Sequence, residues 1–281
     1  MWFLYALISA FSVATSDAFA KLAMRKAGIN EFFIIWLRYI FAAAFLTPFL
    51  LTVQIPHLSS RFFMWHLLWI PTESVGLYLS LKALRISPIS LVGPIMALTP
   101  MFILFTGWIA LGEVPSMSKV PGIFLIIFGS FILGTGRTRI PFGRMIHEKG
   151  ARLMTATAFL YSLSAVAGKG MVIETGPIFF GIYYAIVMLI VFTPLGIANI
   201  GGDIRKAKFE LLMAGLFFAF TIVSHMMAVR DANVAYMIAI KRLSGVFSVI
   251  WGAVLFKEQE IGSRLLGATI MVLGAFIIAV A

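Results

Sequence analysis

The 281-residue chain contains the same segment twice. Residue identities, Arg85 with Arg230 and Glu113 with Glu258 among them, recur 145 positions apart, without a gap, between a stretch from Ala83 to Ile132 and one from Ala228 to Ile277. Upstream the match continues with small slips in the offset, and it pairs Lys21 with Lys169. A repeat this long indicates two duplicated halves rather than a solenoid of small units. Each half must therefore fold as one structural unit.

The composition decides what that unit is made of. Hydrophobic residues make up 61% of the chain and charged residues 12%, with a mean hydropathy of +1.02. A soluble domain is about half apolar and about a quarter charged. The apolar stretches mostly approach the roughly twenty residues that cross a bilayer. They comprise Trp2 to Ala20, Phe32 to Val53, Phe62 to Leu81, Ile89 to Leu111, Val120 to Leu133, Leu153 to Gly168, Ile178 to Ile200, Leu211 to Val229, Val234 to Phe256 and Leu265 to Ala281.

The sequence therefore predicts an all-α integral membrane protein with ten transmembrane helices, five in each half. A unit with an odd number of crossings places its copy upside down in the membrane, as in the inverted repeats of secondary transporters. The predicted organisation is a first five-helix repeat at 1–136, a basic connecting loop at 137–150 and a second repeat at 151–281. A substrate site is expected near the midplane between the repeats.

The charges of the short connections predict the orientation. The formal net charge is +11, and 15 of the 22 cationic residues follow odd-numbered spans while 4 follow even-numbered ones. By the positive-inside rule both termini lie outside the cytoplasm, in a plasma or inner cell membrane. The first apolar run has no Lys or Arg before Lys21, which favours a span over a cleavable signal. The natural partners of these cations are lipid headgroups and anionic solutes rather than nucleic acid.

Several classes of function are disfavoured. The chain has no cysteine, which excludes disulfides and thiolate metal sites. Its four histidines follow no metal-ligand spacing, and the acids and histidines form no catalytic order. We therefore expect neither a metal nor a cofactor, and no enzymatic activity.

Two segments carry a family likeness. They are "ALRISPISLVGPIMALTPMFILFTGWIALGEVPSMSKVPGIFLIIFGSFIL" and "AVRDANVAYMIAIKRLSGVFSVIWGAVLFKEQEIGSRLLGATIMVLGAFII". They resemble the two halves of an EamA-type member of the drug/metabolite transporter superfamily, in which Gly112-Glu113 and Lys257-Glu258 would end spans four and nine. The resemblance implies a ten-span transporter with both termini in the cytoplasm, opposite to the charge count. The superfamily carries amino acids, nucleotide sugars, sugar phosphates, drugs and other metabolites, so it does not select a substrate.

A cation pair is the leading candidate for substrate binding. Lys241 and Arg242 lie inside span nine, where a charged side chain costs about 2.5 to 3.5 kcal/mol and normally faces a cavity or a partner. Lys241 shares a helical stripe with Ser244 and Ser248. The first repeat has Met96 and Ala97 at the equivalent positions, so the pair occurs in one half only.

The motif "IKRLS" resembles the Lys-Arg pair on the ninth span of plastid sugar-phosphate translocators, where the pair binds phosphate. Both side chains suit phosphate or carboxylate groups. The alternative is that the intramembrane acids Asp17 and Glu73 satisfy both cations and that the cluster serves packing only.

Other polar residues inside spans are further candidates. Arg38 and Tyr161 are expected near the substrate, and Glu73, Asp17 and His225 are candidates for coupling or gating. Asp17 lies four residues before Lys21, so a local ion pair is the simpler interpretation. Glu73 is either a proton-coupling carboxylate or a counter-ion to Arg38. Tyr161 either binds substrate or packs as an ordinary aromatic residue.

The expected function is a secondary transporter that moves a small organic anion, phosphorylated or carboxylated, by alternating access. Alternatives are a proton-coupled exporter of amino acids or amphipathic drugs, and a lipid-linked sugar flippase or envelope-modification component. Small residues also repeat at a spacing of seven on spans five and ten, which permits either a homodimer or close packing within the chain. They are Gly122, Gly129, Gly267 and Gly274.

Overall fold

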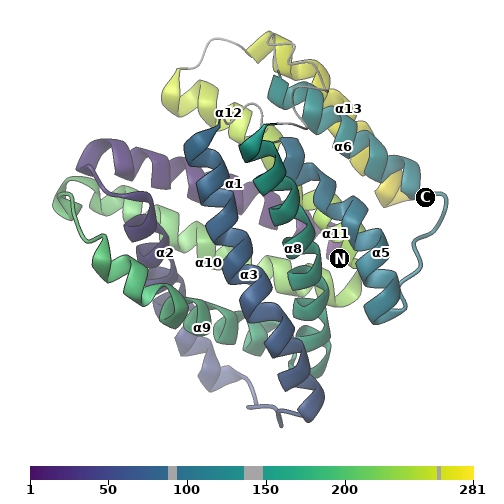
Figure 1. Cartoon of the computed structure of the whole chain (residues 1–281), viewed down its shortest axis with the longest axis horizontal. Helices are drawn as coiled ribbons and strands as arrows, with labels where there is room; N and C mark the ends of the chain where they lie inside the picture. The colour runs from purple at the N-terminus through teal and green to yellow at the C-terminus, as the bar shows by residue number, and fades with distance from the viewer. Residues whose placement is uncertain (88–93, 136–147, 258–260) are drawn as a thin grey trace.

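The computed structural model describes residues 1–87, 94–135, 148–257 and 261–281, and every regular element in these ranges is a helix (Figure 1). The elements of the first half are α1 (Trp2–Ala27), α2 (Glu31–Leu46), η1 (Thr47–Thr52), α3 (Ser60–Ile86), η2 (Pro94–Leu98), α5 (Thr99–Leu111) and α6 (Val120–Thr135). Those of the second half are α8 (Lys149–Thr175), α9 (Pro177–Ala198), η3 (Ile204–Ala207), α10 (Lys208–Asp231), α11 (Val234–Lys241), α12 (Ser244–Phe256) and α13 (Ile261–Val280).

The structure describes only part of the predicted boundary between the halves. Residues 137–147 of the predicted connecting loop, and also Pro88, Gly93 and Glu258, lie outside the described residues. Lys149 and Gly150, which were assigned to the loop, form the first turn of α8. Glu148 caps this turn because its carboxylate accepts a hydrogen bond from the Ala151 amide at 2.8 Å.

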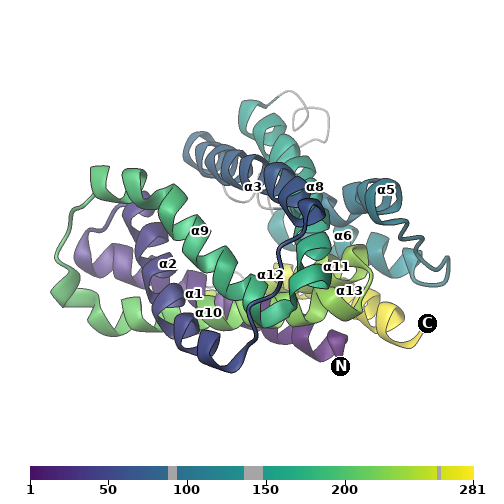
Figure 2. The same cartoon turned by 90° about the horizontal axis from the view of Figure 1, so that it is seen from below.

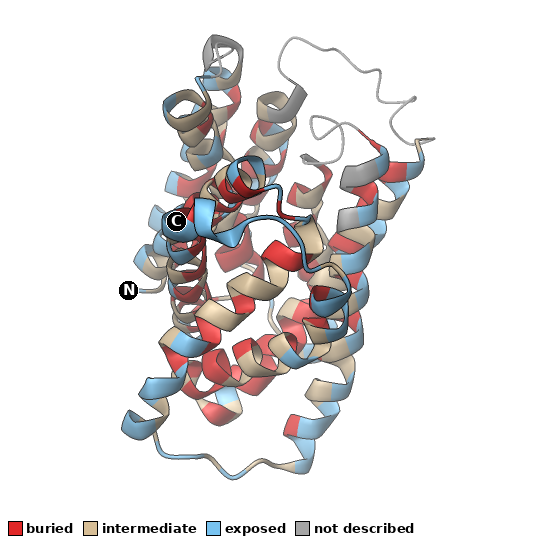
Figure 3. Ribbon diagram, turned by 90° about the vertical axis from the view of Figure 1, so that its left-hand side faces the viewer, coloured by how far each residue is buried: buried red, intermediate tan, exposed pale blue. Residues whose placement is uncertain are grey.

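The helices have the apolar character of membrane spans. Six helical segments of the described chain are long and apolar enough to cross a bilayer, and three further apolar helices are shorter. The remaining predicted span corresponds to α3, which belongs to neither group and contains Arg61, Glu73, Lys82 and Arg85. Many large apolar side chains face outward, and Figure 3 shows buried faces toward the centre. The helical membrane class is confirmed, whereas the count of ten crossings stays a prediction.

Helices of the two halves pack against each other in related pairs. Under the repeat, α8 is the copy of α1 and α10 is the copy of α3. The contact of α1 with α10 therefore recurs as the contact of α8 with α3, and α2 packs against its own copy α9. Figures 1 and 2 both show α3 beside α8, while α1, α2, α9 and α10 form a second group.

The seven-residue glycine spacing brings α6 and α13 together within one chain. A Cβ on Gly122 would lie 2.6 Å from the Gly274 carbonyl oxygen, and one on Gly129 would lie 2.7 Å from that of Gly267. Only residues without side chains allow two helix backbones this close. The glycine faces are thus occupied by intramolecular packing. A homodimer through these two spans stays a prediction.

Span nine contains a tight 3₁₀-type turn between two helices, which its sequence did not reveal. Helix α11 ends at Lys241 and α12 begins at Ser244, with the i+3 bond from the Gly245 amide to the Arg242 carbonyl between them. The first repeat has a junction at the equivalent point, where η2 ends at Leu98 and α5 begins at Thr99. Both central spans therefore contain an irregular turn at repeat-equivalent positions.

Candidate functional site: a charged cavity between the repeats

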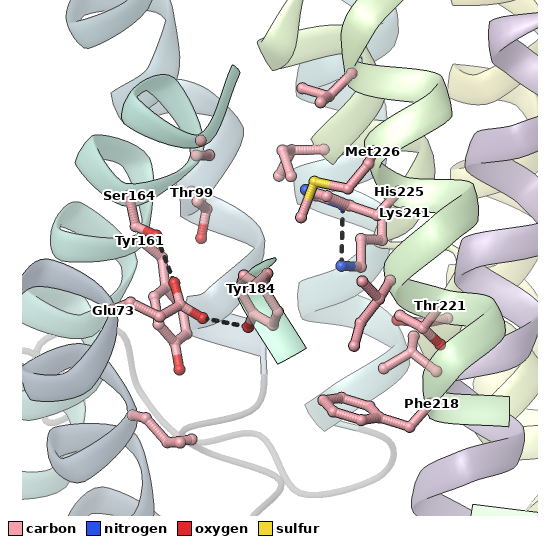
Figure 4. Close-up of a pocket in the computed structure, with 18 of the residues that line it drawn as sticks. Glu73, Thr99, Tyr161, Ser164, Tyr184, Phe218, Thr221, His225, Met226 and Lys241 are labelled. Carbon is pink, nitrogen blue, oxygen red and sulfur yellow. Dashed lines mark hydrogen bonds between the residues drawn. The ribbon is translucent and has the colours of Figure 1, made fainter. Parts of the chain in front are cut away.

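A cavity of about 430 Å³ lies between the two halves. Helices α1, α2, α3, η2 and α5 line it from the first half, and α8, α9, α10, α11 and α12 line it from the second. Its volume is in the range of pockets for small organic molecules. The lining combines apolar and aromatic side chains with a few charged ones, as Figure 4 shows.

One wall carries the cation pair. Lys241 Nζ lies 3.2 Å from Nδ1 of His225, and a charged lysine must be the donor in this contact. Arg242 follows immediately and also lines the cavity, and its buried Nε has no hydrogen-bond partner in the described chain. Neither cation forms an ion pair with a carboxylate among the described residues.

The opposite wall carries Glu73. Figure 4 shows Glu73 and Ser164 on one side of the cavity and His225 and Lys241 on the other. The Tyr184 hydroxyl donates to Glu73 Oε1 at 2.9 Å, and the Ser164 hydroxyl donates to Oε2. Each of its two oxygens therefore accepts a hydroxyl hydrogen bond. No cation pairs with Glu73 in the part of the chain that the structure describes.

Asp17 and Arg38 neutralise each other. Arg38 donates to Asp17 at 2.8 Å, and its guanidinium lies 4.4 Å from the centre of the Phe218 ring. The Asp17 side chain is 59% exposed although it lines the cavity, so the cavity reaches the surface there. We expected Asp17 to pair with Lys21 on its own helix, but among the described residues it pairs with Arg38 of α2 instead. Glu73 is not the counter-ion of Arg38.

Two helix N-termini reach the cavity. Thr99 begins α5 and Ser244 begins α12, and both line the cavity. These residues are repeat equivalents, 145 positions apart. Each helix continues from a preceding helical turn, and at α12 the Gly245 and Val246 amides already donate to the carbonyls of Arg242 and Leu243. These amides are therefore not free to bind an anion.

A buried ion pair lies near the far end of α8. Lys169, 8% exposed, pairs with Glu113 at the end of α5 and donates to the Ala232 carbonyl. Glu113 also accepts from the Val234 amide at 2.9 Å and so holds the start of α11. The charge count had placed Lys169 in a connection after an even-numbered span. Its burial inside α8 removes it from that count and leaves the imbalance larger.

The structure brings eight of the nine predicted site residues to this cavity. They are Asp17, Arg38, Glu73, Tyr161, His225, Lys241, Arg242 and Ser244. Ser248 is the exception: it is exposed on α12 and is not among the lining residues. Ser248 lies one turn beyond Ser244 on α12, and Ser244 is the last residue of this helix that lines the cavity.

Sequence reasoning missed most of the partners of these residues. Two of them, Tyr184 and Phe218, could have been predicted because they occupy the repeat positions of Arg38 and Glu73. Tyr184 follows Arg38 by 146 positions, the offset that relates Thr47 to Thr193, and Phe218 follows Glu73 by 145. The other missed lining residues with polar groups or aromatic rings include Tyr39, Trp69, Thr99, Ser164, Phe180 and Thr221.

With this geometry established, the comparisons with known proteins identify the family. The model of the EamA-like transporter family matches the chain twice, at residues 1–135 and 148–280. The chain belongs to the EamA-like transporter family. The family-level resemblance is thereby confirmed, and the protein is a multi-pass membrane transporter of the drug/metabolite superfamily.

Structural similarity extends over the whole EamA-like chain. A solved structure described only as the crystal structure of a protein covers 98% of this chain and 98% of its own, with a TM-score of 0.73 and 14% sequence identity. At this identity the similarity concerns the fold alone. No protein of curated function matches the chain in sequence.

Proposed function

We propose that this EamA-like protein is a secondary transporter of a small organic anion, phosphorylated or carboxylated, that binds between the repeats at Lys241 and Arg242. One observation carries the proposal: both cations line the cavity without a carboxylate partner in the described chain, while Asp17 is already paired with Arg38. Unpaired charges inside a membrane protein are costly and usually mark a substrate or ion pathway. A bound anion would supply the missing partner.

The surroundings of the pair support an anion rather than a cation. His225 adds a polar ring nitrogen beside Lys241. The lining holds three fixed cations against two carboxylates. A net positive cavity attracts anions and opposes cations.

Transport would proceed by alternating access of the two repeats around the cavity, with an expected ten crossings. For the termini we retain the orientation from the charge count, outside the cytoplasm, against the cytoplasmic placement implied by the family. The chain has no native cysteine, so a single cysteine at an exposed position such as Arg61 reports its own side of the membrane. Arg61 follows an even-numbered span, so labelling of Arg61→Cys by an impermeant maleimide from the outside only would support the charge count; labelling from the cytoplasmic side only would overturn it.

The anion proposal is tested by thermal stabilisation of purified protein with a panel of inorganic phosphate, glycerol 3-phosphate, succinate and tetraphenylphosphonium. A ligand that binds the folded state must raise its stability. We expect stabilisation by at least one anion and none by the cation. Because a charge-assisted hydrogen bond contributes about 1.5 to 3 kcal/mol, Lys241→Met should weaken anion binding by about tenfold or more.

The matched control is Arg230→Gln, which removes an exposed cation outside the cavity and should leave anion binding unchanged. Stabilisation by tetraphenylphosphonium alone would contradict the proposal and favour an exporter of amphipathic cations. Anion binding that is equal in Lys241→Met, Arg242→Gln and the unmodified protein would contradict the assignment of the site.

A further inference from the structure

The cavity has two charged poles rather than one, and its second pole is Glu73. This carboxylate lines the wall opposite Lys241, on a different helix and in the other repeat (Figure 4). Its oxygens accept from the Tyr184 and Ser164 hydroxyls, which fix the carboxylate without neutralising it. No cation pairs with it within the described ranges. A simple anion would satisfy only the Lys241 pole.

The charges at the two poles are unequal. Lys241 and Arg242 present two cations that no described carboxylate pairs with, and Glu73 presents one carboxylate. The Asp17–Arg38 pair is internally neutral. The complement of this arrangement is a doubly negative group at one end of the substrate and a singly positive group at the other. A phosphomonoester carries nearly two negative charges at neutral pH, and a primary amine carries one positive charge.

The space between the poles is lined by aromatic rings. Tyr161, Tyr184 and Phe218 all border the cavity, and Figure 4 shows Tyr184 between the two walls. Rings of this kind pack against the apolar body of a bound molecule and also attract an ammonium group. Tyr184 therefore serves two contacts, because its hydroxyl also positions Glu73.

We infer that the cavity selects phosphomonoesters that carry an ammonium group, with the phosphate at Lys241 and Arg242 and the ammonium at Glu73. Glu73 is then a specificity-determining residue that separates aminated from non-aminated anions. This inference rests on the proposed anion site and names its substrate class. An amino acid with one carboxylate would leave one cation of the pair without a partner.

The test uses ω-aminoalkyl phosphates of increasing chain length, beginning with O-phosphoethanolamine, each paired with the alkyl phosphate that lacks the amine. Dissociation constants are measured on the purified full chain by thermal stabilisation. In the unmodified protein we expect at least one aminated member to bind about tenfold or more tightly than its non-aminated partner. Glu73→Gln should abolish this preference by weakening the aminated ligand only.

Asp231→Asn is the matched control, since it removes an exposed carboxylate outside the cavity and should preserve the preference. Equal affinity for both members of every pair in the unmodified protein would overturn the inference and leave the anion proposal standing. If the unmodified protein binds neither the aminated nor the non-aminated phosphates, the anion proposal itself is wrong. β-Alanine that binds as tightly as the aminated phosphates would overturn the requirement for a doubly negative group. The comparison in the unmodified protein stands even if Glu73→Gln does not fold.

Discussion

Two corners of the molecule are copies of one another and yet differ in packing. Helix α2 lies close to α10, and a Cβ on Gly215 would be only 2.1 Å from Phe41 Cβ. The copy of this corner is formed by α9 and α3, where Ile70 takes the place of Gly215 (215 − 145 = 70). There the helices meet through aromatic rings such as Trp69 and Tyr184, 5.4 Å between centres. Figure 2 shows α3 standing with α8, apart from α2.

The difference teaches that one structural unit occurs here in two arrangements. In the α2–α10 corner the Phe41 side chain packs directly against the backbone at Gly215, whereas the α3–α9 corner depends on contacts between side chains and on the Tyr183–His66 and Tyr184–Glu73 hydrogen bonds. Alternating access by inverted repeats requires two copies of a unit that adopt different arrangements at the same time. The cavity residue Glu73 lies in the α3–α9 corner, the looser of the two because its helices pack less closely than α2 and α10 do. A bound substrate would therefore contact a helix, α3, that is held less tightly against its neighbour α9.

The largest expected effect concerns the buried ion pair of Lys169 with Glu113. Lys169→Met leaves Glu113 buried without its cation, which should lower the free energy of unfolding by about 3 to 5 kcal/mol. Reversible unfolding in mixed detergent micelles measures the change. The double variant Lys169→Met/Glu113→Gln should recover part of the loss, and Arg230→Gln should cost less than about 1 kcal/mol. If Lys169→Met lowers the free energy of unfolding by as little as the control does, the Lys169–Glu113 pair does not stabilise the fold.

The next effect separates the two corners directly. Gly215→Ile forces a side chain against Phe41 and should destabilise the protein by about 1 to 3 kcal/mol or more. Ile70→Val, at the equivalent position of the looser corner, should cost about 0.5 to 1.5 kcal/mol. The same unfolding assay compares them. If Gly215→Ile is tolerated at least as well as Ile70→Val, the α2–α10 corner is not the rigid one.

The smallest effect concerns the C-terminal caps of the two central spans. Gly112 ends α5 with φ 69°, and its repeat equivalent Lys257 ends α12 with φ 55°. A left-handed conformation costs a residue with a Cβ about 1 kcal/mol, and glycine adopts it freely. Lys257→Gly should therefore stabilise the protein by up to about 1 kcal/mol, and Gly112→Lys should destabilise it similarly. If both exchanges stabilise the protein, or both destabilise it, this interpretation of the caps is wrong.

The sequence predicted the features that depend on local pattern and repetition. Apolar length marked the helices, and the offset of 145 correctly related α5 to α12 and α6 to α13. Charged residues inside spans led to the cavity because an ionised side chain is retained there only with a cavity or a partner. These arguments need no knowledge of which helices touch.

The partners could not be predicted, because they depend on tertiary packing. Tyr184 lies in a uniformly apolar helix, where nothing distinguishes a tyrosine facing lipid from one facing Glu73. The turn after Arg242 has no proline to mark it. The depth to which the cavity extends along α12 was equally hidden, so Ser248, one turn beyond Ser244, was included although it is exposed and does not line the cavity. Lys169 was assigned to a connection although it pairs with Glu113 inside the protein.

The central claim, that the cation pair binds the transported anion, is tested most directly by counterflow in proteoliposomes. Vesicles loaded with unlabelled glycerol 3-phosphate are diluted into the radiolabelled compound, and uptake is compared among the unmodified protein, Lys241→Met/Arg242→Gln and the control Arg230→Gln. O-Phosphoethanolamine is assayed in parallel. The account predicts uptake of at least one of the two by the unmodified protein and the control, and none by the double variant. Uptake by the double variant at the rate of the control would contradict it.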